Sequence, residues 1–238
     1  MHARRSIVLL FSLILGLSTG LQASADDSVL SVVAVQVNSG QLDTYSARVA
    51  ELQTHMTRLG VDGTPVTWQA TAAGPATGTV FVAIQYPSLA SYAAGTAKSA
   101  ADPEFGKLIG GLDDIRTIAS NSLYRNVFGG GEADAGTLLQ TVTVKVAPGR
   151  LADYVAQLEK LQAVQQRVGS SGKMRAWQAT AAGPNTGNVV IGIIYADLAT
   201  YAADTAKIQA DAEWQKIIGG LDGMRTIVST GLARRVSQ

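Results

Sequence analysis

The amino-acid sequence predicts an α+β protein built from two tandem βαββαβ units. First, residues 68–75 (WQATAAGP) return as residues 177–184, an offset of 109, and the same offset aligns residues 109–113 (IGGLD) with 218–222. Self-similarity at a fixed offset is the signature of a duplicated architecture. Second, 238 residues that are 47% hydrophobic and 16% charged can form two globular domains of about 100 residues each.

The first 25 residues have the pattern of a secretory signal peptide. Arg4 and Arg5 precede a short apolar run at residues 7–17, and residues 23–25 (ASA) fit the small-residue rule for cleavage. We therefore expect cleavage after Ala25 and a periplasmic or secreted protein. The apolar run is shorter than the roughly 20 residues of a membrane-spanning helix, so we expect no stable membrane insertion after cleavage. An uncleaved anchor is the alternative.

Charge and cysteine content exclude several classes of protein. Without Arg4 and Arg5 the 19 basic residues fall to 17, against 18 acidic ones, and no basic run marks a surface for nucleic acid. The chain has no cysteine, so export brings no disulfide and the fold must be held by packing.

Each unit begins with a strand and an amphipathic helix. Residues 29–37 and 138–146 are strongly apolar and rich in β-branched residues, as in strands buried on both faces. Apolar residues then recur at helical spacing, and in the second unit the polar Gln165 interrupts this stripe. Both helices are expected to end near a glycine, Gly60 or Gly169, that can adopt a left-handed conformation. The stripes consist of Leu42, Tyr45, Val49, Leu52, Met56 and Leu59, and of Leu151, Tyr154, Leu158, Leu161 and Val168.

The remaining elements follow in the same order in both units. A Gly-Pro turn after the repeated WQAT motif predicts a hairpin. A short alanine-rich helix, a further helical turn and a final strand come next, and residues 128–137 are glycine-rich, as in a flexible linker. The expected ranges are 65–71 and 173–180 for the second strands, 79–86 and 188–195 for the third strands, 88–100 and 198–210 for the second helices, and 115–127 and 224–236 for the last strands.

The order βαββαβ specifies a ferredoxin-like sandwich, a four-stranded antiparallel sheet with helices on one face. The expected domains are residues 26–127 and 138–238, on either side of the linker. Because each sheet would leave one apolar face uncovered, we expect the two sheets to pack face to face.

The WQAT strand, the segments DPEF (102–105) and DAEW (211–214) and the closing RTI strands resemble the dimeric α/β barrel superfamily, over residues 29–127 and 138–236. Within this superfamily the sequence most resembles NIPSNAP-like domains, and antibiotic biosynthesis monooxygenase domains are related to them. The resemblance implies an intramolecular barrel and, in monooxygenase members, a ligand cavity between sheet and helices. The superfamily also includes haem-degrading enzymes, chlorite dismutases and members without known activity.

Catalytic residues of common types are scarce in the expected mature chain. Its one histidine, His55, has Val164 as its counterpart, so we expect no haem or other cofactor and no metal site. The single histidine also argues against a Ser-His-Asp triad. The glycine run at 129–131 opens no helix and is interpreted as linker rather than as a phosphate site.

Polar and aromatic residues retained in both units are the candidates for ligand binding. Alternation places Trp68 and Gln69 on opposite faces of the sheet, so one of them can face the barrel interior. A core role is the alternative, since each tryptophan can bury about 150–250 Å². The candidates are Trp68, Gln69, Tyr92, Arg116, Trp177, Gln178, Tyr201 and Arg225.

Three functions remain open from the sequence. The first is an exported binding or structural protein that holds a small apolar or aromatic ligand. The second is a cofactor-free monooxygenase-like enzyme that acts on such a molecule. The third is a protein that assembles into a homo-oligomer. A buried cavity with polar groups converging on it would favour the first two, and a filled interior would favour the third.

Overall fold

A computed structural model describes residues 26–130 and 136–236, so the expected signal peptide and half of the expected linker lie outside the described residues. The described chain forms eight strands and six α-helices. In the first half these are β1 (Val29–Val37), α1 (Leu42–Arg58), β2 (Pro65–Ala72), β3 (Val80–Tyr86), α2 (Leu89–Ala101), α3 (Pro103–Gly110) and β4 (Arg116–Phe128). In the second half they are β5 (Leu138–Val146), α4 (Leu151–Arg167), β6 (Lys173–Ala181), β7 (Val189–Tyr195), α5 (Leu198–Gln209), α6 (Ala212–Gly219) and β8 (Arg225–Arg235).

The helix boundaries have local causes in the sequence. The side chain of Ser88 accepts a hydrogen bond from the backbone N–H of Ser91 at the start of α2, and Asp197 caps α5 in the same way. Asp102 and Asp211 cap α3 and α6, each accepting from two backbone N–H groups. After α1 and α4 the chain turns at Gly60 and Gly169, whose φ angles of 60° and 70° confirm the expected left-handed conformation. None of the helices in the described ranges is long and apolar enough to cross a membrane.

The eight strands form one closed antiparallel barrel in the order β1-β3-β2-β8-β5-β7-β6-β4. Within each half the order is that of a ferredoxin-like sheet. The expected face-to-face packing needs refinement, because hydrogen-bonded strand pairs β2–β8 and β4–β6 also join the halves edge to edge. We call these two pairs the seams. Closure gives the edge strands partners for their backbone N–H and C=O groups, which two stacked sheets would leave open.

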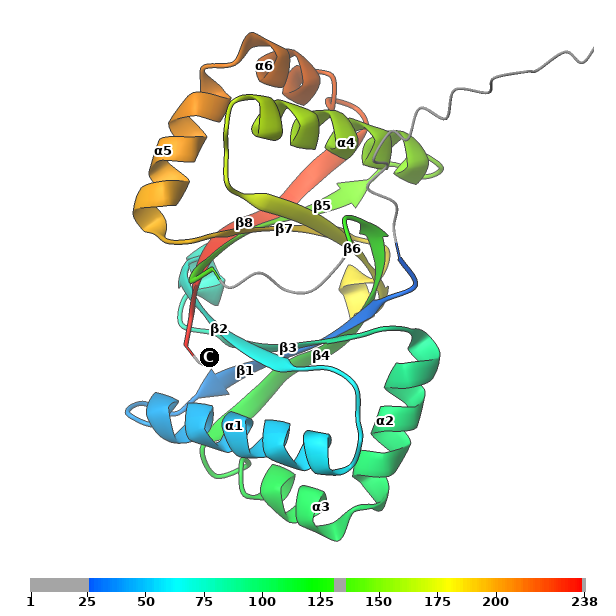
Figure 1. Ribbon diagram of the computed structural model, residues 1–238, viewed down its shortest axis with the longest axis vertical. Helices are drawn as coiled ribbons and strands as arrows, with labels where there is room; N and C mark the ends of the chain where they lie inside the picture. The colour runs from blue at the N-terminus through cyan, green and yellow to red at the C-terminus, as the bar shows by residue number, and fades with distance from the viewer. Residues whose placement is uncertain (1–25, 131–135, 237–238) are drawn as a thin grey trace, which may run out of the picture.

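Two helical layers cover opposite sides of the barrel, with α1, α2 and α3 on one side and α4, α5 and α6 on the other (Figure 1). Each layer packs on the outer sheet face of its own half. In the first half Tyr45 and Val49 of α1 lie against Val35 and Val80. Inside the barrel, Trp68 packs with residues of both halves. The protein therefore has one helix–sheet core in each half and a third core within the barrel.

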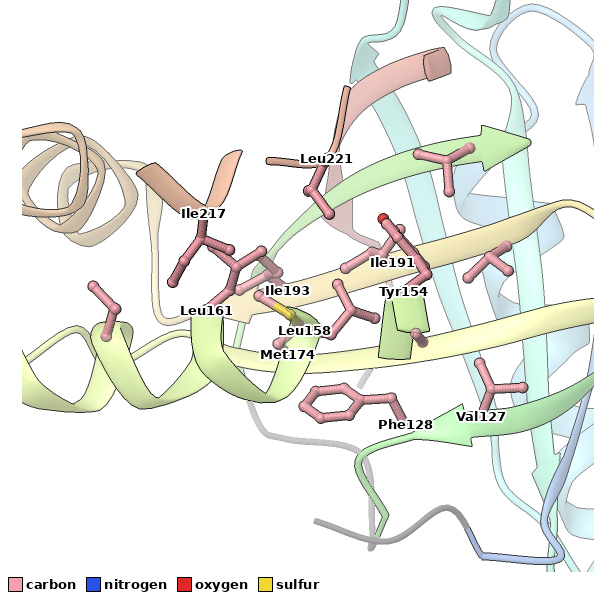
Figure 2. Packing of buried hydrophobic residues seen from close by; sticks show 14 of the residues in the cluster. Val127, Phe128, Tyr154, Leu158, Leu161, Met174, Ile191, Ile193, Ile217 and Leu221 are labelled. Carbon is pink, nitrogen blue, oxygen red and sulfur yellow. The ribbon is translucent and has the colours of Figure 1, made fainter. Parts of the chain in front are cut away.

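The last strand of the first half contributes to the core of the second half. Val127 and the fully buried Phe128 belong to the same cluster as Leu158 and Met174 (Figure 2). Phe128 was expected to begin the linker, but it is the final residue of β4, where it pairs with Ala176 of β6. Its apolar side chain is buried there because the seam carries β4 onto the second half.

Candidate functional site

A cavity of about 170 Å³ lies between the sheet of the second half and its helical layer. We call it the second-half cavity. Its wall is formed by strands β5, β6 and β7, the three helices and the start of β8. The lining residues are Gln140, Val142, Tyr154, Leu158, Leu161, Gln165, Met174, Ile191, Ile193, Tyr195, Thr205, Ile208, Gln209, Trp214, Ile218, Leu221 and Arg225.

Helix α4 supplies one wall through a regular stripe. Tyr154, Leu158, Leu161 and Gln165 follow one another at spacings of four, three and four residues, which places them on one helix face. Figure 2 shows the first three of these side chains together with Ile191, Ile193 and Met174 from the sheet. Most of the lining is thus aliphatic or aromatic, as in a site for a small apolar ligand.

The ionisable groups of the lining are two tyrosines and one arginine. Burial raises the pKa of Tyr154, while the positive charge of Arg225 opposes that rise. Burial, with smaller contributions from Asp204 and Tyr201, raises the pKa of Tyr195 to about 12. The described lining includes no carboxylate, imidazole or amine. Both tyrosines are therefore neutral near pH 7, and Arg225 is the fixed charge of the cavity wall.

Gln165 is the unusual member of the wall. Its side chain is 1% exposed, and neither Nε2 nor Oε1 has a hydrogen-bond partner among the described residues. Buried side-chain amides are ordinarily satisfied, because each unpaired polar group costs about 1–3 kcal/mol. In the sequence this residue was visible only as an interruption of the apolar stripe, and it was not among the predicted site residues.

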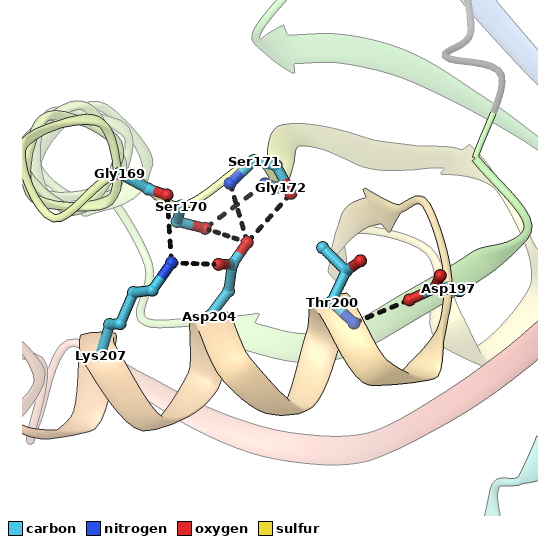
Figure 3. Close-up of polar contacts among 8 residues, drawn as sticks. All are labelled: Gly169, Ser170, Ser171, Gly172, Asp197, Thr200, Asp204 and Lys207. Carbon is cyan, nitrogen blue, oxygen red and sulfur yellow. Dashed lines mark hydrogen bonds and ion pairs between the residues drawn. The ribbon is translucent and has the colours of Figure 1, made fainter.

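A buried carboxylate anchors the loop that follows α4. Asp204 of α5 is 3% exposed and accepts hydrogen bonds from the backbone N–H of Ser171 at 2.8 Å and from Lys207 Nζ at 3.1 Å (Figure 3). The hydroxyls of Ser170 and Ser171 also donate to it. Burial works against the ionised form, but these hydrogen bonds and the Lys207 charge outweigh it and lower the pKa of Asp204. The network ties α5, which supplies lining residues Thr205 and Ile208, to the end of α4.

Two of the predicted candidates lie at or beside this cavity. Arg225 is part of the lining. Tyr201 packs against the same core cluster, with its ring edge-on to Tyr195 at a centroid distance of 5.3 Å. The counterparts Tyr92 and Arg116 occupy equivalent places in the first half, where Tyr92 meets Tyr86 in the same edge-on contact.

The other four candidates lie elsewhere in the barrel. Trp68 is buried in the barrel interior, with the guanidinium of Arg235 6.0 Å from its ring centroid, and Trp177 pairs with Val190 and Asn126. The strand pairing confirms the expected alternation. Gln69 and Gln178 each lie on the opposite side of the sheet from the neighbouring tryptophan.

The two glutamines sit at the seams. Gln69 Oε1 accepts from Arg234 Nε and a terminal guanidinium nitrogen at 3.1 and 2.8 Å, and Gln178 Oε1 accepts likewise from Arg125 at 3.0 and 2.6 Å. Each pair links one half to the other. The sequence signal for these pairs was the retention of Arg125 and Arg234 in both units, but only the strand order assigns each arginine to its partner.

The first half carries a different set of side chains around the equivalent space. Met56, the counterpart of Gln165, is buried in an all-apolar cluster with Leu52 and Leu108. The tyrosine and arginine at one end of the cavity are shared by both halves, whereas the amide at the other end belongs to the second half. At the offset of 109, the lining residues Gln165, Gln140 and Gln209 correspond to Met56, Ser31 and Ala100, while Thr205 corresponds to Thr96.

A second cavity, of about 220 Å³, is lined by residues of β4, β5, β6, β7 and β8 and of the turn between β6 and β7. Its lining is mainly polar and includes none of the predicted site residues. It consists of Tyr124, Thr143, Ala179, Asn185, Asn188, Val190, Val228 and Ser229. Burial raises the pKa of Tyr124, and a hydrogen bond with Ser122 partly offsets the rise.

Comparison with known proteins identifies the fold but not the function. No protein-family model and no curated protein sequence matches the chain. Among solved structures, a proposed monooxygenase from Lactobacillus acidophilus NCFM superimposes with a TM-score of 0.59 and 9% identity, over 89% of this chain and 94% of that one. A chlorite dismutase from Candidatus Nitrospira defluvii gives 0.54 and 10%, over 90% and 93%. A haem-binding protein from Thermus thermophilus gives 0.56 and 6%, over 89% and 92%.

These identities are too low to transfer an activity. The superpositions nevertheless cover most of both chains, and they include proteins of monooxygenase and chlorite dismutase type. The chain therefore shares its overall fold with these structures.

Proposed function

We propose that the protein binds a small, mainly apolar ring molecule in the second-half cavity. The observation that carries this proposal is the cavity itself, about 170 Å³ and lined mostly by aliphatic and aromatic side chains. An engineered apolar cavity of about 150 Å³ in another protein holds benzene. Drug-sized ligands occupy about 300–1,000 Å³. The volume thus matches a single ring with small substituents.

Toluene is a suitable first probe, with binding followed by calorimetry or by ligand-observed NMR. Leu161→Trp places an indole in the cavity, so we expect it to weaken toluene binding about tenfold or more. Leu52→Trp is the matched control, because Leu52 is the counterpart of Leu161 and packs with Met56 and Leu108. The control should lose stability and keep toluene binding. Absence of toluene binding to the native protein would refute the proposal.

A monooxygenase-like reaction is the second candidate. The solved structures of similar fold include a proposed monooxygenase, which favours such a reaction over a purely structural role. The supporting observation within the cavity is Arg225, a cation that can stabilise a substrate anion such as a phenolate. In the reaction a phenol and O₂ give a quinone and water. One oxygen atom becomes the second carbonyl, and the other leaves as water with the hydroxyl hydrogen and one ring hydrogen. The four electrons come from the substrate.

The lining has no general base, so this reaction is restricted to phenols acidic enough to ionise beside Arg225. The test is oxidation of 2,6-dichlorophenol, whose chlorine atoms make the hydroxyl acidic, under ¹⁸O₂ with mass spectrometry of the quinone. One ¹⁸O atom per product is expected. Arg225→Met should slow turnover about 100-fold, and Arg116→Met in the first half should leave it unchanged. No oxygen uptake with any single-ring phenol would leave binding as the function.

Haem does not fit the second-half cavity. The cavity is smaller than a drug-sized site, and its lining contains no histidine. His55, the one histidine of the described chain, lies on α1 in the other half, where its Nδ1 is 3.1 Å from Arg58. The described residues also hold no cluster of three or more His, Cys, Asp or Glu side chains able to bind a metal ion. Haem and metal ions are therefore not part of the proposed function.

We further propose that the chain is an exported tandem duplication of a ferredoxin-like unit, with NIPSNAP-like domains as its relatives within the superfamily. The 109-residue offset and the secretory pattern of residues 1–25 support this. Mass spectrometry of the protein recovered from the periplasm or medium should give a chain that begins at Asp26. A retained N-terminal segment would contradict export with cleavage.

Homo-oligomer formation is the remaining proposal. Ile118 of β4 and Ile227 and Val228 of β8 are each more than half exposed, and such apolar side chains favour association. Light scattering after size exclusion tests this proposal, with a monomer mass as the contrary result.

A further inference from the structure

We propose that Gln165 is the recognition group of the second-half cavity and that the ligand presents a hydrogen-bond donor and an acceptor on adjacent atoms of one edge. Lactams, primary amides and neutral carboxylic acids have such an edge. This inference rests on the proposed binding function and names the class of ligand.

The side-chain amide of Gln165 has unmet hydrogen-bonding capacity. Gln165 is 1% exposed, lines the cavity, and has both amide atoms without a partner among residues 26–130 and 136–236. A primary amide offers a donor and an acceptor side by side. Because both are unpaired, exchanging the assignments of Nε2 and Oε1 leaves the conclusion unchanged. A ligand that satisfies both must carry the complementary pair on one edge.

Packing alone does not require an amide at position 165. Among the other buried residues of α4, Leu158, Leu161 and Val164 are apolar, and only Tyr154 carries a polar group. The counterpart Met56 has a chain of similar length and is buried in an apolar cluster of the first half. The same fold thus accepts methionine here, so the amide in the second half has a role other than filling space.

Two polar groups beside Gln165 are held by partners other than its side-chain amide. The carboxylate of Asp204 is held by Ser170, Ser171 and Lys207 (Figure 3), and the backbone carbonyl of Gln165 accepts from the N–H of Ser170. The loop after α4 is therefore fixed by its own contacts. Neither the Asp204 carboxylate nor the loop backbone satisfies the side-chain amide of Gln165.

The test compares two probes that differ in one hydrogen-bond donor. 2-Pyridone is a single ring with adjacent N–H and C=O groups, and N-methyl-2-pyridone has the same ring with the donor blocked. We expect the native protein to bind 2-pyridone about tenfold or more tighter than its N-methyl derivative, since one buried hydrogen bond is lost. In Gln165→Met the preference for 2-pyridone over its N-methyl derivative should disappear, because methionine offers no amide donor and acceptor.

The outcomes separate this inference from the proposed function. If toluene binds and the native protein does not distinguish the two pyridones, Gln165 is not the recognition group although the cavity is a binding site. The same conclusion follows if Gln165→Met keeps the preference. If toluene does not bind to the native protein, the proposed function itself fails. The comparison of the two pyridones uses the native protein, so it decides the matter even if the variant folds poorly.

Discussion

Replacing Gln165 with methionine should stabilise the ligand-free protein. The substitution removes two buried polar atoms that have no partner among the described residues and supplies an apolar side chain of similar length. Each unsatisfied group costs about 1–3 kcal/mol. Since a longer apolar side chain can also repack imperfectly, we expect a net gain of about 1–3 kcal/mol in the free energy of unfolding.

Urea denaturation at pH 7, followed by circular dichroism, measures this gain. For a chain of this size each kcal/mol corresponds to about 2–4 °C in the melting midpoint, so a thermal scan gives an independent reading. The matched control is Met56→Gln, which buries an amide among Leu52 and Leu108 and should lose about 2–4 kcal/mol. Loss of more than about 1 kcal/mol in Gln165→Met would refute the reasoning, because it would mean that the amide has partners in solution.

Three further predictions concern the rest of the molecule. Asp204→Asn should lose about 2–4 kcal/mol at pH 7, because it breaks a buried network of hydrogen bonds. The pKa of Asp204 is lowered in the folded state, so its stabilisation is present above the ordinary value near 4 and is lost as pH falls through the folded value. Urea curves at pH 7 and pH 3 should therefore show a smaller difference at pH 3, and an equal difference would contradict the role of the ionised carboxylate. Trp68→Ala should lower the free energy of unfolding by about 3–5 kcal/mol without changing toluene affinity, since the side chain is 5% exposed in the barrel interior. A large loss of toluene affinity in a fully folded variant would show that Trp68 takes part in ligand binding. A double-mutant cycle of Gln69→Ala with Arg234→Ala should give a coupling of about 0.5–1 kcal/mol, as expected for exposed hydrogen bonds, and additive effects would show that this seam contact contributes nothing.

Several features of the protein were determined by local sequence. The β-branched runs predicted β1 and β5 with the observed bounds, and the apolar stripe on α1 identified Tyr45, Val49, Leu52 and Met56 as its buried face. These features were readable because strand alternation, helical periodicity and glycine turns each depend on a few neighbouring residues. The order of elements then limited the sheet to a ferredoxin-like arrangement.

The candidate site was less accessible to sequence reasoning. Retention in both units selected Arg225, which lines the cavity, but it also selected Gln69 and Gln178, which pair with arginines at the seams. Retention finds what the two halves share. Gln165 was not selected because the first half has methionine at the equivalent position. A polar residue in an apolar helical stripe can be either buried or exposed, and only the tertiary structure shows which.

The sequence alone determined the repeat, the succession of strands and helices, and most of the side chains that α1 and α4 bury. The tertiary structure decided how the barrel closes and where space remains. Closure depends on β4 meeting β6 and β8 meeting β2, pairings between residues far apart in the chain. The second-half cavity depends on the combined shapes of side chains from four strands, three helices and a turn, so no local pattern encodes its volume. Only in that setting does the buried amide of Gln165 become a binding group.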